Sequence, residues 1–396
     1  MRNFLYTKAQ LFFAVNVLAC IGLNIGVIGV NWFVISSTGE NRLLGLYGAV
    51  SLVSAFFTLA LASTFTDRYS KLSLLRFCCV GQSFLFFLTA LLSSFKIPVI
   101  WIIYGLALFN MPLMVLFSVV SRGIIPSVWQ EKDLSKGNAV LEITLQIGAV
   151  CAALLTGFLY HVFGFSVLLN IGGLLCLSAG GLLFCWPASI EEHSNKQSAR
   201  YWKDLKEGLL YLTKNVRCLI YGLIAFIPTI VISVSNTVFP GYVEQALGAG
   251  VFSYALGDTF FSVGALISGL LGIRVGQYKK FCLIPFLFAS TIAGLGVLAV
   301  GKNVLLFYIV VFFLGISLAG LRILLNSVFM EKTNPLYLGR VLSLLMALSM
   351  AIQAVLSYIV GSYMDKRGAS NGFLVLLFLS VAGLVCLFLT ESKRDK

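Results

Sequence analysis

The sequence predicts an all-α integral membrane protein with twelve transmembrane helices, arranged as two six-helix bundles. The 396 residues are 59% hydrophobic and only 11% charged, whereas a typical soluble domain is nearer half apolar and a quarter charged. Twelve helices of about 20 residues would use about 240 residues, which accounts for most of the apolar fraction. A charged turn also recurs, in degraded form, half a chain later, which indicates a duplicated membrane protein.

The charged turn spans residues 63–71 and reads Ser-Thr-Phe-Thr-Asp-Arg-Tyr-Ser-Lys. Its second copy spans residues 269–277 and reads Gly-Leu-Leu-Gly-Ile-Arg-Val-Gly-Gln. Each copy lies between two apolar runs that are long enough to cross a bilayer. Because charged side chains are costly inside hydrocarbon, we expect both turns at a membrane surface.

In the first half, each long apolar run is taken as one helix. The first run follows Lys8 and, at about 28 residues, is too long for the core of a cleaved signal peptide, so we expect it to be retained. Pro98 is expected to open the fourth helix, and a polar loop around Trp129 to follow it. The expected helices cover about 9–36, 43–66, 74–94, 98–122, a segment that begins near 138, and 165–186.

The second half repeats this layout after a long polar segment. That segment, residues 187–217, includes an amphipathic helix from Tyr201 that is expected on the inner membrane surface. The later helices are expected at about 218–241, 252–273, 281–300, 304–328, 340–363 and 371–390. The expected domains are therefore an N-terminal bundle over 1–186, a cytoplasmic linker over 187–217 and a C-terminal bundle over 218–396.

The formal net charge is +13, and its distribution indicates what the bases do. With twelve crossings, most of the 28 Lys and Arg residues fall on the side of the two termini. The positive-inside rule then places both termini in the cytoplasm, and we expect a multi-pass protein of the cell inner membrane. The bases are expected to face anionic membrane lipid, and nucleic acid is not an expected partner.

The sequence contains no recognisable enzyme constellation. Its nine cysteines are scattered, mostly inside apolar runs and without the spacing of metal ligands, and it has two histidines. It has no nucleophile elbow and no glycine-rich phosphate loop. We therefore expect no catalytic residues, no metal and no cofactor. No oligomerisation signal is evident, so a monomer is expected.

The charged turn, in this layout, resembles the signature of the major facilitator superfamily, Gly-x-x-x-Asp-Arg-x-Gly-Arg. Asp67 and Arg68 match the signature, whereas Ser63, Ser70 and Lys71 replace the two glycines and the final arginine. The resemblance covers essentially the whole chain. It implies the major facilitator fold, with two bundles that bind a small-molecule substrate between them and move protons or another coupling ion.

Several short motifs resemble a narrower branch, the exporters of the macrolide-efflux and enterobactin-exporter type. They are Trp32-Phe-Val, Leu134-x-x-Gly-Asn138-Ala, Asp204-Leu-Lys-Glu-Gly-Leu-Leu-Tyr, Phe239-Pro-Gly-Tyr-Val and Gly339-Arg340-Val. The Gly-Pro pair that exporters of the superfamily often carry in the fifth helix is replaced here by Ala152-Ala153. The branch resemblance implies proton-coupled efflux, by antiport, of a small organic or amphipathic solute such as a drug or a siderophore.

Three other functions stay open. The fold also serves solute importers and lysophospholipid flippases, and the segment from Gly137 to Glu142 resembles the fifth helix of such flippases. Those flippases carry an acid in the first helix where this chain has Asn24. A non-transporting membrane receptor or assembly factor on the same scaffold is the third alternative.

Two groups of charged residues are candidates for conformational and proton coupling. The resemblance implies a latch formed by Asp67, Arg68 and Lys71, with Arg340 as the partner from the second half; the alternative is a turn whose bases only set topology. The acids Glu142 and Asp258 are proton-coupling candidates because ionisable groups inside a membrane span are costly and usually functional.

Each acid also has a structural alternative. Glu142 is a possible ion-pair partner of Lys136 or Arg122, and Asp258 a possible cap or rim residue. A further set of polar residues inside the spans is expected to line the substrate cavity, with interhelical hydrogen bonding as the alternative and, for the arginine, snorkelling. The set comprises Asn24, Asn31, Asn110, Gln146, Asn236, Arg322 and Gln353.

Overall fold

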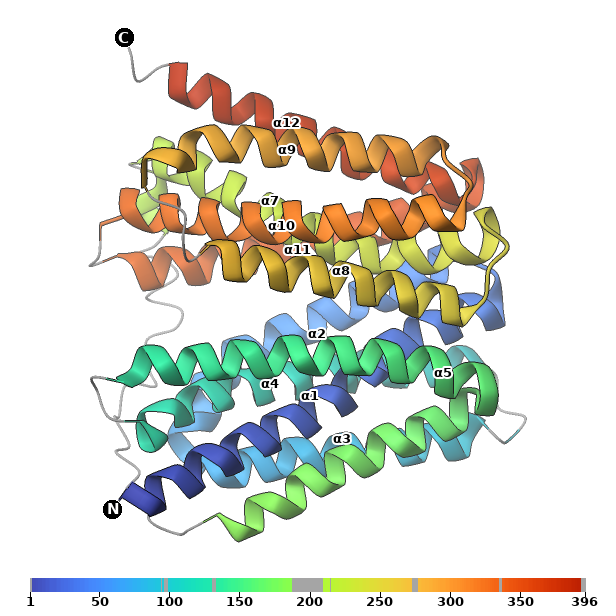
Figure 1. Cartoon of the computed structure of the whole chain (residues 1–396), viewed down its shortest axis with the longest axis vertical. Helices are drawn as coiled ribbons and strands as arrows, with labels where there is room; N and C mark the ends of the chain where they lie inside the picture. Colours follow the sequence, from blue (N-terminus) through green and yellow to red (C-terminus); the bar gives the residue numbers. More distant parts are fainter. Residues whose placement is uncertain are drawn as a thin grey trace. The chain divides into compact units, whose positions relative to one another are not determined.

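The computed structural model of the chain describes residues 2–93, 95, 99–129, 133–186, 209–213, 215–272, 277–334 and 337–392. Nearly all of these residues are helical (Figure 1). Within the described ranges, 11 helices are long and apolar enough to cross a membrane. One of them, Lys136–Cys185, has 50 residues and contains a kink, so it accounts for two crossings. The predicted all-α membrane fold with twelve helices is confirmed.

Five long helices form the first half of the chain. They are α1 (Arg2–Thr38), α2 (Asn41–Arg68), α3 (Lys71–Ser93), α4 (Val99–Val128) and α5 (Leu134–Leu182), and the short helix η2 (Leu183–Cys185) follows. Gly164 interrupts α5 with φ 81° and ψ −178°. Only glycine adopts this backbone conformation readily. It lets the chain turn back between the segments expected as the fifth and sixth helices.

Six long helices form the second half. They are α7 (Val216–Gly241), α8 (Val251–Gly272), α9 (Gln277–Val300), α10 (Val304–Lys332), α11 (Leu338–Arg367) and α12 (Gly372–Ser392), with short turns η3 (Tyr242–Ala246) and η4 (Ala369–Asn371). Most of the amphipathic helix expected in the linker lies outside the described residues, although residues 209–213 are helical.

The helices are longer than the hydrophobic runs that predict them. α2 continues through Arg68 and α3 begins at Lys71, so only Tyr69 and Ser70 separate the two helices. α4 likewise continues to Val128, beyond the expected end at 122. The hydrophobic run ends at the first charged residue. The helix continues beyond it, because long charged side chains reach into the membrane interface and the backbone hydrogen bonds need not stop there.

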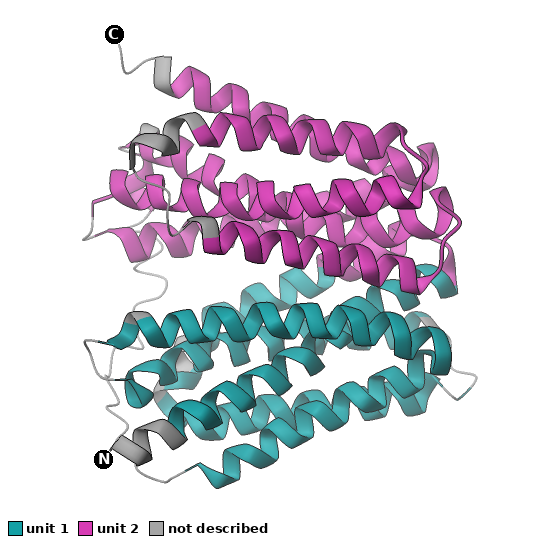
Figure 2. Cartoon of the chain, viewed as in Figure 1, with its two compact units in different colours: residues 1–37, 50–199 teal, residues 38–49, 200–396 magenta. Residues whose placement is uncertain are grey.

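The chain divides into two compact units (Figure 2). Unit 1 comprises Met1–Ser37 and Val50–Ala199, and unit 2 comprises Thr38–Ala49 and Arg200–Lys396. The division runs through α2, whose first turns belong to unit 2 although the rest of the helix belongs to unit 1. No sequence pattern indicates this grouping of residues 38–49, and the predicted domain boundaries around the linker stay a prediction.

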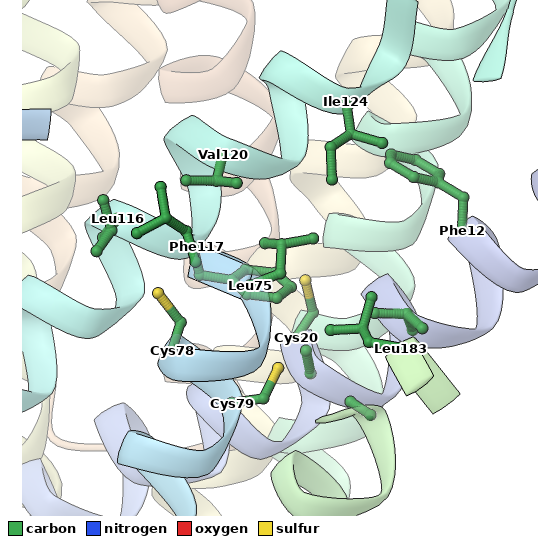
Figure 3. Packing of buried hydrophobic residues seen from close by; sticks show 14 of the residues in the cluster. Phe12, Cys20, Leu75, Cys78, Cys79, Leu116, Phe117, Val120, Ile124 and Leu183 are labelled. Atoms are coloured by element: carbon green, nitrogen blue, oxygen red, sulfur yellow. The ribbon is translucent and has the colours of Figure 1, made fainter. Parts of the chain in front are cut away.

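The core of unit 1 is a cluster of apolar side chains from α1 to α5 and η2. Four cysteines, Cys20, Cys78, Cys79 and Cys176, are buried in it, and Figure 3 shows the first three near Leu75 and Phe117. No group of three or more His, Cys, Asp or Glu residues within the described ranges is arranged to hold a metal ion. These thiols therefore pack as small apolar side chains.

Glycines set the closest helix approaches in unit 2. A Cβ atom at Gly264 of α8 would collide with the backbone carbonyl oxygen of Phe312 on α10. A Cβ at Gly315 of α10 would collide in the same way with the carbonyl oxygen of Phe261 on α8. Small residues allow this close backbone contact, which is the main source of helix association inside a bilayer. The pair α8–α10 thus forms a rigid support for the charged residues that it carries.

Candidate functional site

The carboxylate of Asp258 lies inside a membrane span. α8 begins at Val251, so Asp258 is about two helical turns from its start. The side chain is half-buried, and among the described residues it has no hydrogen-bond or ion-pair partner. An acid in this position costs free energy unless it faces a polar cavity or binds a proton. Asp258 therefore stays a candidate for proton coupling.

Glu142, the other acidic candidate, is paired. Arg122 on α4 donates a hydrogen bond of 2.8 Å from Nη2 to Oε1 of Glu142 on α5. The two side chains are 50% and 53% exposed, which places the pair at the surface of unit 1. Lys136 pairs instead with Asp133, at 2.8 Å. The geometry of Glu142 is that of its structural alternative, an ion pair that joins α4 to α5.

The residues of the expected latch lie at helix ends. Arg68 is the last residue of α2 and is exposed, while the side chain of Asp67 lies outside what the structure describes. Lys71, the first residue of α3, donates from Nζ to the backbone carbonyl of Gly123 on α4 at 2.9 Å. Arg340 lies in the first turn of α11, with its guanidinium 5.9 Å from the ring centre of Tyr337. Lys71 therefore links α3 to α4 within unit 1.

Three of the polar residues expected in the cavity form hydrogen bonds with neighbours. Asn110 on α4 accepts a hydrogen bond of 2.8 Å from Nε2 of the buried Gln82 on α3. Asn24 donates to the carbonyl of Cys20 at 2.8 Å, and Gln353 donates to Ser349 at 2.6 Å. The contact of Asn110 joins two helices, whereas the contacts of Asn24 and Gln353 stay within their own helices.

The other four expected cavity residues differ in their surroundings. Asn31 is buried, and Gln146, Asn236 and Arg322 are half-buried. Within the described ranges none of the four forms a side-chain hydrogen bond or ion pair. Arg322 lies ten residues before the end of α10 at Lys332, or about 15 Å along the helix. Its guanidinium is therefore available to an anionic group well inside the span.

An apolar groove of about 860 Å³ lies between α2, α3 and α4 of unit 1. Aromatic side chains such as Phe65, Phe77, Phe84 and Phe109 line it. Few polar side chains line the groove, among them that of Tyr69. The lining of the groove suits the apolar part of a small solute. No local sequence pattern predicts this groove, because its lining comes from three helices.

A second feature missed from the sequence is the contact between Asn41 and Asp365. Both backbone and side chain of Asn41, at the start of α2, donate to the carboxylate of Asp365, near the end of α11. Asn before a predicted helix is a capping signal. The acceptor, however, lies 324 residues away in the chain, and no local pattern connects the two.

Residues 12–347 match the sequence profile of the Major Facilitator Superfamily. The chain belongs to the Major Facilitator Superfamily. Members of this superfamily are transporters rather than enzymes, and the predicted superfamily resemblance is confirmed. The protein is therefore a multi-pass membrane protein that acts as a secondary transporter of a small-molecule substrate.

The chain is distantly similar to a siderophore transporter and to a drug efflux protein. The staphyloferrin A transporter of Staphylococcus aureus (strain NCTC 8325 / PS 47) is 26% identical over 350 residues, which cover 85% of this chain and 84% of the relative. Macrolide efflux protein A of Streptococcus pyogenes is 22% identical over 284 residues, which cover 69% of each chain.

Solved structures of the superfamily share the fold. A nucleoside transporter, NupG, superposes with a TM-score of 0.75 at 15% identity and covers 97% of this chain and 99% of its own. A D-xylose-proton symporter superposes with a TM-score of 0.73 at 14% identity, over 96% and 97% of the two chains. At these identities the likeness extends to the fold alone.

Proposed function

We propose that the protein exports a small amphipathic organic solute, such as a drug or a siderophore, in exchange for protons. The observation that carries the proton coupling is Asp258, a half-buried carboxylate inside α8 without a partner among the described residues. One charge that moves across 100 mV supplies about 2.3 kcal/mol. A tenfold solute gradient requires about 1.4 kcal/mol. One proton per cycle therefore suffices for a substantial gradient.

Two observations support an amphipathic solute. The apolar groove of about 860 Å³ accommodates the apolar part of such a molecule. In unit 2, the half-buried guanidinium of Arg322 on α10 is suited to bind a carboxylate or phosphate group. The named relatives are a staphyloferrin A transporter and a macrolide efflux protein; a carboxylate-bearing siderophore suits Arg322, and the apolar face of a macrolide suits the groove. The direction, outward, follows the efflux relative.

The remaining elements of the proposal concern topology and the latch. The protein lies in the cell inner membrane as a monomer, with both termini and the linker at residues 187–217 in the cytoplasm, because most bases fall on that side. The end of α2 and the starts of α3 and α11 act as the conformational latch through Asp67, Arg68, Lys71 and Arg340, as the superfamily resemblance implies. Alternating access then proceeds by rocking of the two halves.

The test is transport in inverted membrane vesicles with an imposed pH gradient. Radiolabelled macrolides, siderophores and lysolipids are offered to wild type, to Asp258→Asn and to Glu142→Gln, which serves as the matched control because its carboxylate is already paired. We expect proton-dependent accumulation that Asp258→Asn abolishes and Glu142→Gln retains. Accumulation only in right-side-out vesicles would make the protein an importer, and movement of lysolipid alone would make it a flippase. A lack of movement of every solute in both orientations would contradict transport of these solute classes and favour a receptor role.

A further inference from the structure

The first turn of α2 is capped by a side chain from another helix. The backbone N–H groups of Asn41 and Arg42 donate to the two carboxylate oxygens of Asp365 on α11, each at 2.8 Å. The side-chain amide of Asn41 donates to the same carboxylate at 2.9 Å. The first N–H groups of a helix have no partner inside the helix, and a carboxylate satisfies them with charge-assisted hydrogen bonds. Asp365 thus stands in for a local N-cap residue.

Further contacts complete this capped start. Nδ2 of Asn41 also donates to Oε1 of Gln245 at 2.8 Å, and Nε2 of Gln245 donates to the carbonyl of Gly39 at 2.9 Å. We call Gly39, Asn41, Arg42 and Gly45, together with Gln245 and Asp365, the α2 seat. All of these residues belong to unit 2.

Glycines bring the backbones of the seat into direct contact. A Cβ atom at Gly361 of α11 would collide with the carbonyl oxygen of Asn41, and one at Gly45 of α2 would collide with the carbonyl oxygen of Ser357 on α11. Gly241, the last residue of α7, leaves space for Oδ1 of Asn41. Asn41 is consequently 0% exposed. The side chain of Asn41 is enclosed in this way, whereas Arg42, Gln245 and Asp365 are exposed at its edge.

The seat is also incompletely satisfied. Oδ1 of Asn41 is buried and has no hydrogen-bond partner, and the same holds for the hydroxyl oxygens of Ser357 and Ser362 on α11. Buried polar atoms without partners favour the hydrated, open form of a contact. The cap from Asp365 therefore stabilises the closed contact, whereas the unpartnered oxygens destabilise it. Such a balance suits a contact that breaks and reforms.

We propose that the α2 seat is a releasable joint and that Asp365 is the positioning residue that holds it closed. α2 begins in unit 2 and continues through unit 1, so release of its first turn removes the hold of Asp365 on the start of that helix. The inference rests on the alternating access of the proposed function. Loss of the cap from Asp365 is the local event that opens this end of the protein.

The experiment uses Ser357→Cys in the full-length chain as a reporter of opening. Ser357 is 1% exposed beneath α2, and its hydroxyl has no partner, so the substitution removes no hydrogen bond. A membrane-impermeant maleimide is applied to each face of the membrane in turn, and labelling of the parent chain without Ser357→Cys is subtracted. No solute is needed, so failure of the transport assay and failure of this inference are distinguishable.

Slow labelling is expected in the reporter chain. Asp365→Ala, which removes the cap, is expected to accelerate labelling about tenfold, in line with the loss of one helix cap. Asn41→Asp provides a second, isosteric variant that places a like charge against Asp365 and should act in the same direction. Glu40→Gln is the matched control because Glu40 is an exposed acid next to the seat, and it should leave the rate unchanged. Fast labelling of the Ser357→Cys chain without a further substitution would overturn the proposal. Equal labelling rates in that chain and in its Asp365→Ala and Asn41→Asp variants, with all three inserted in the membrane, would also overturn it.

Discussion

Arg122 on α4 holds the carboxylate of Glu142 on α5 in an ion pair with an N–O distance of 2.8 Å. The pair links two helices of unit 1 and leaves both side chains about half exposed, at 50% and 53%. The arginine thus gives this carboxylate a structural partner at the surface of the unit. Glu142 therefore differs from Asp258, the other acidic candidate, which has no partner among the described residues.

Replacement of Glu142 by Gln should have a small effect. Because the ion pair is exposed to solvent, we expect a loss of at most about 1 kcal/mol in the free energy of unfolding. Proton-dependent transport should persist. Thermal unfolding in detergent and vesicle accumulation check the two statements, and complete loss of coupling with unchanged insertion would return Glu142 to the coupling role.

Asp258→Asn should uncouple transport from protons without preventing solute exchange. The amide occupies the same space but carries no titratable proton, so a pH gradient should no longer drive accumulation. Counterflow, in which labelled solute exchanges for unlabelled solute with no gradient of protons, should continue. Loss of both activities in a correctly inserted variant would instead indicate that Asp258 contributes to solute binding or folding.

The buried pair of Gln82 and Asn110 should contribute measurably to stability. Gln82 is 0% and Asn110 1% exposed, so Asn110→Ala leaves a buried amide donor without its acceptor. We expect a destabilisation of about 1–3 kcal/mol. The double variant Gln82→Leu/Asn110→Leu, which removes both polar groups, should lie closer to wild type. Unfolding midpoints in a double-mutant cycle test this, and additive losses would argue against the pairing.

Gly164→Ala should strain the turn inside α5. With φ 81° and ψ −178°, the backbone lies in a region that costs a residue with a side chain about 1–3 kcal/mol. Gly181→Ala is the matched control because it lies in the same element, where an added Cβ would have no neighbour within 4 Å. Protein yield and unfolding temperature should fall for the first variant only; equal behaviour of the two would show that the turn tolerates the strain.

Gly81→Leu should weaken binding of an amphipathic solute by filling the groove between α2, α3 and α4. Gly81 is part of the groove lining, and a Cβ added there would lie 3.4 Å from Leu113. The expected result is a higher KM with little change in kcat, since the groove binds the apolar part of the solute. Gly105→Leu on α4, where an added Cβ meets open space, controls for bulk alone. An unchanged KM would exclude the groove from the transport route of that solute.

The positions of the membrane helices were predictable because hydrophobic length is a local property of the chain. The segment from 165 to 186 was expected as a separate helix, and Gly164 supplies the backbone turn that separates it. The expected helices were too short at their C-terminal ends, since α2 continues to Arg68 and α4 to Val128. Hydropathy shows where the apolar run stops and not where the backbone hydrogen bonds stop.

The roles of polar residues inside the spans depended on partners that no local pattern contains. Glu142 and Asp258 look alike in the sequence, as acids within apolar runs, yet one meets Arg122 and the other meets no partner within the described residues. Asp365 reads as an ordinary acid beside two bases, but it caps a helix that begins 324 residues earlier.

The sequence by itself therefore determined the helical class, the number of crossings and the superfamily, because these follow from apolar length, charge placement and short local motifs. Only the tertiary structure decided which carboxylates are paired, which polar residues join helices and where α2 begins its contact with unit 2. Helix packing brings together groups that are distant in the chain, and the energy of a buried charge is set by those groups and not by its neighbours in sequence.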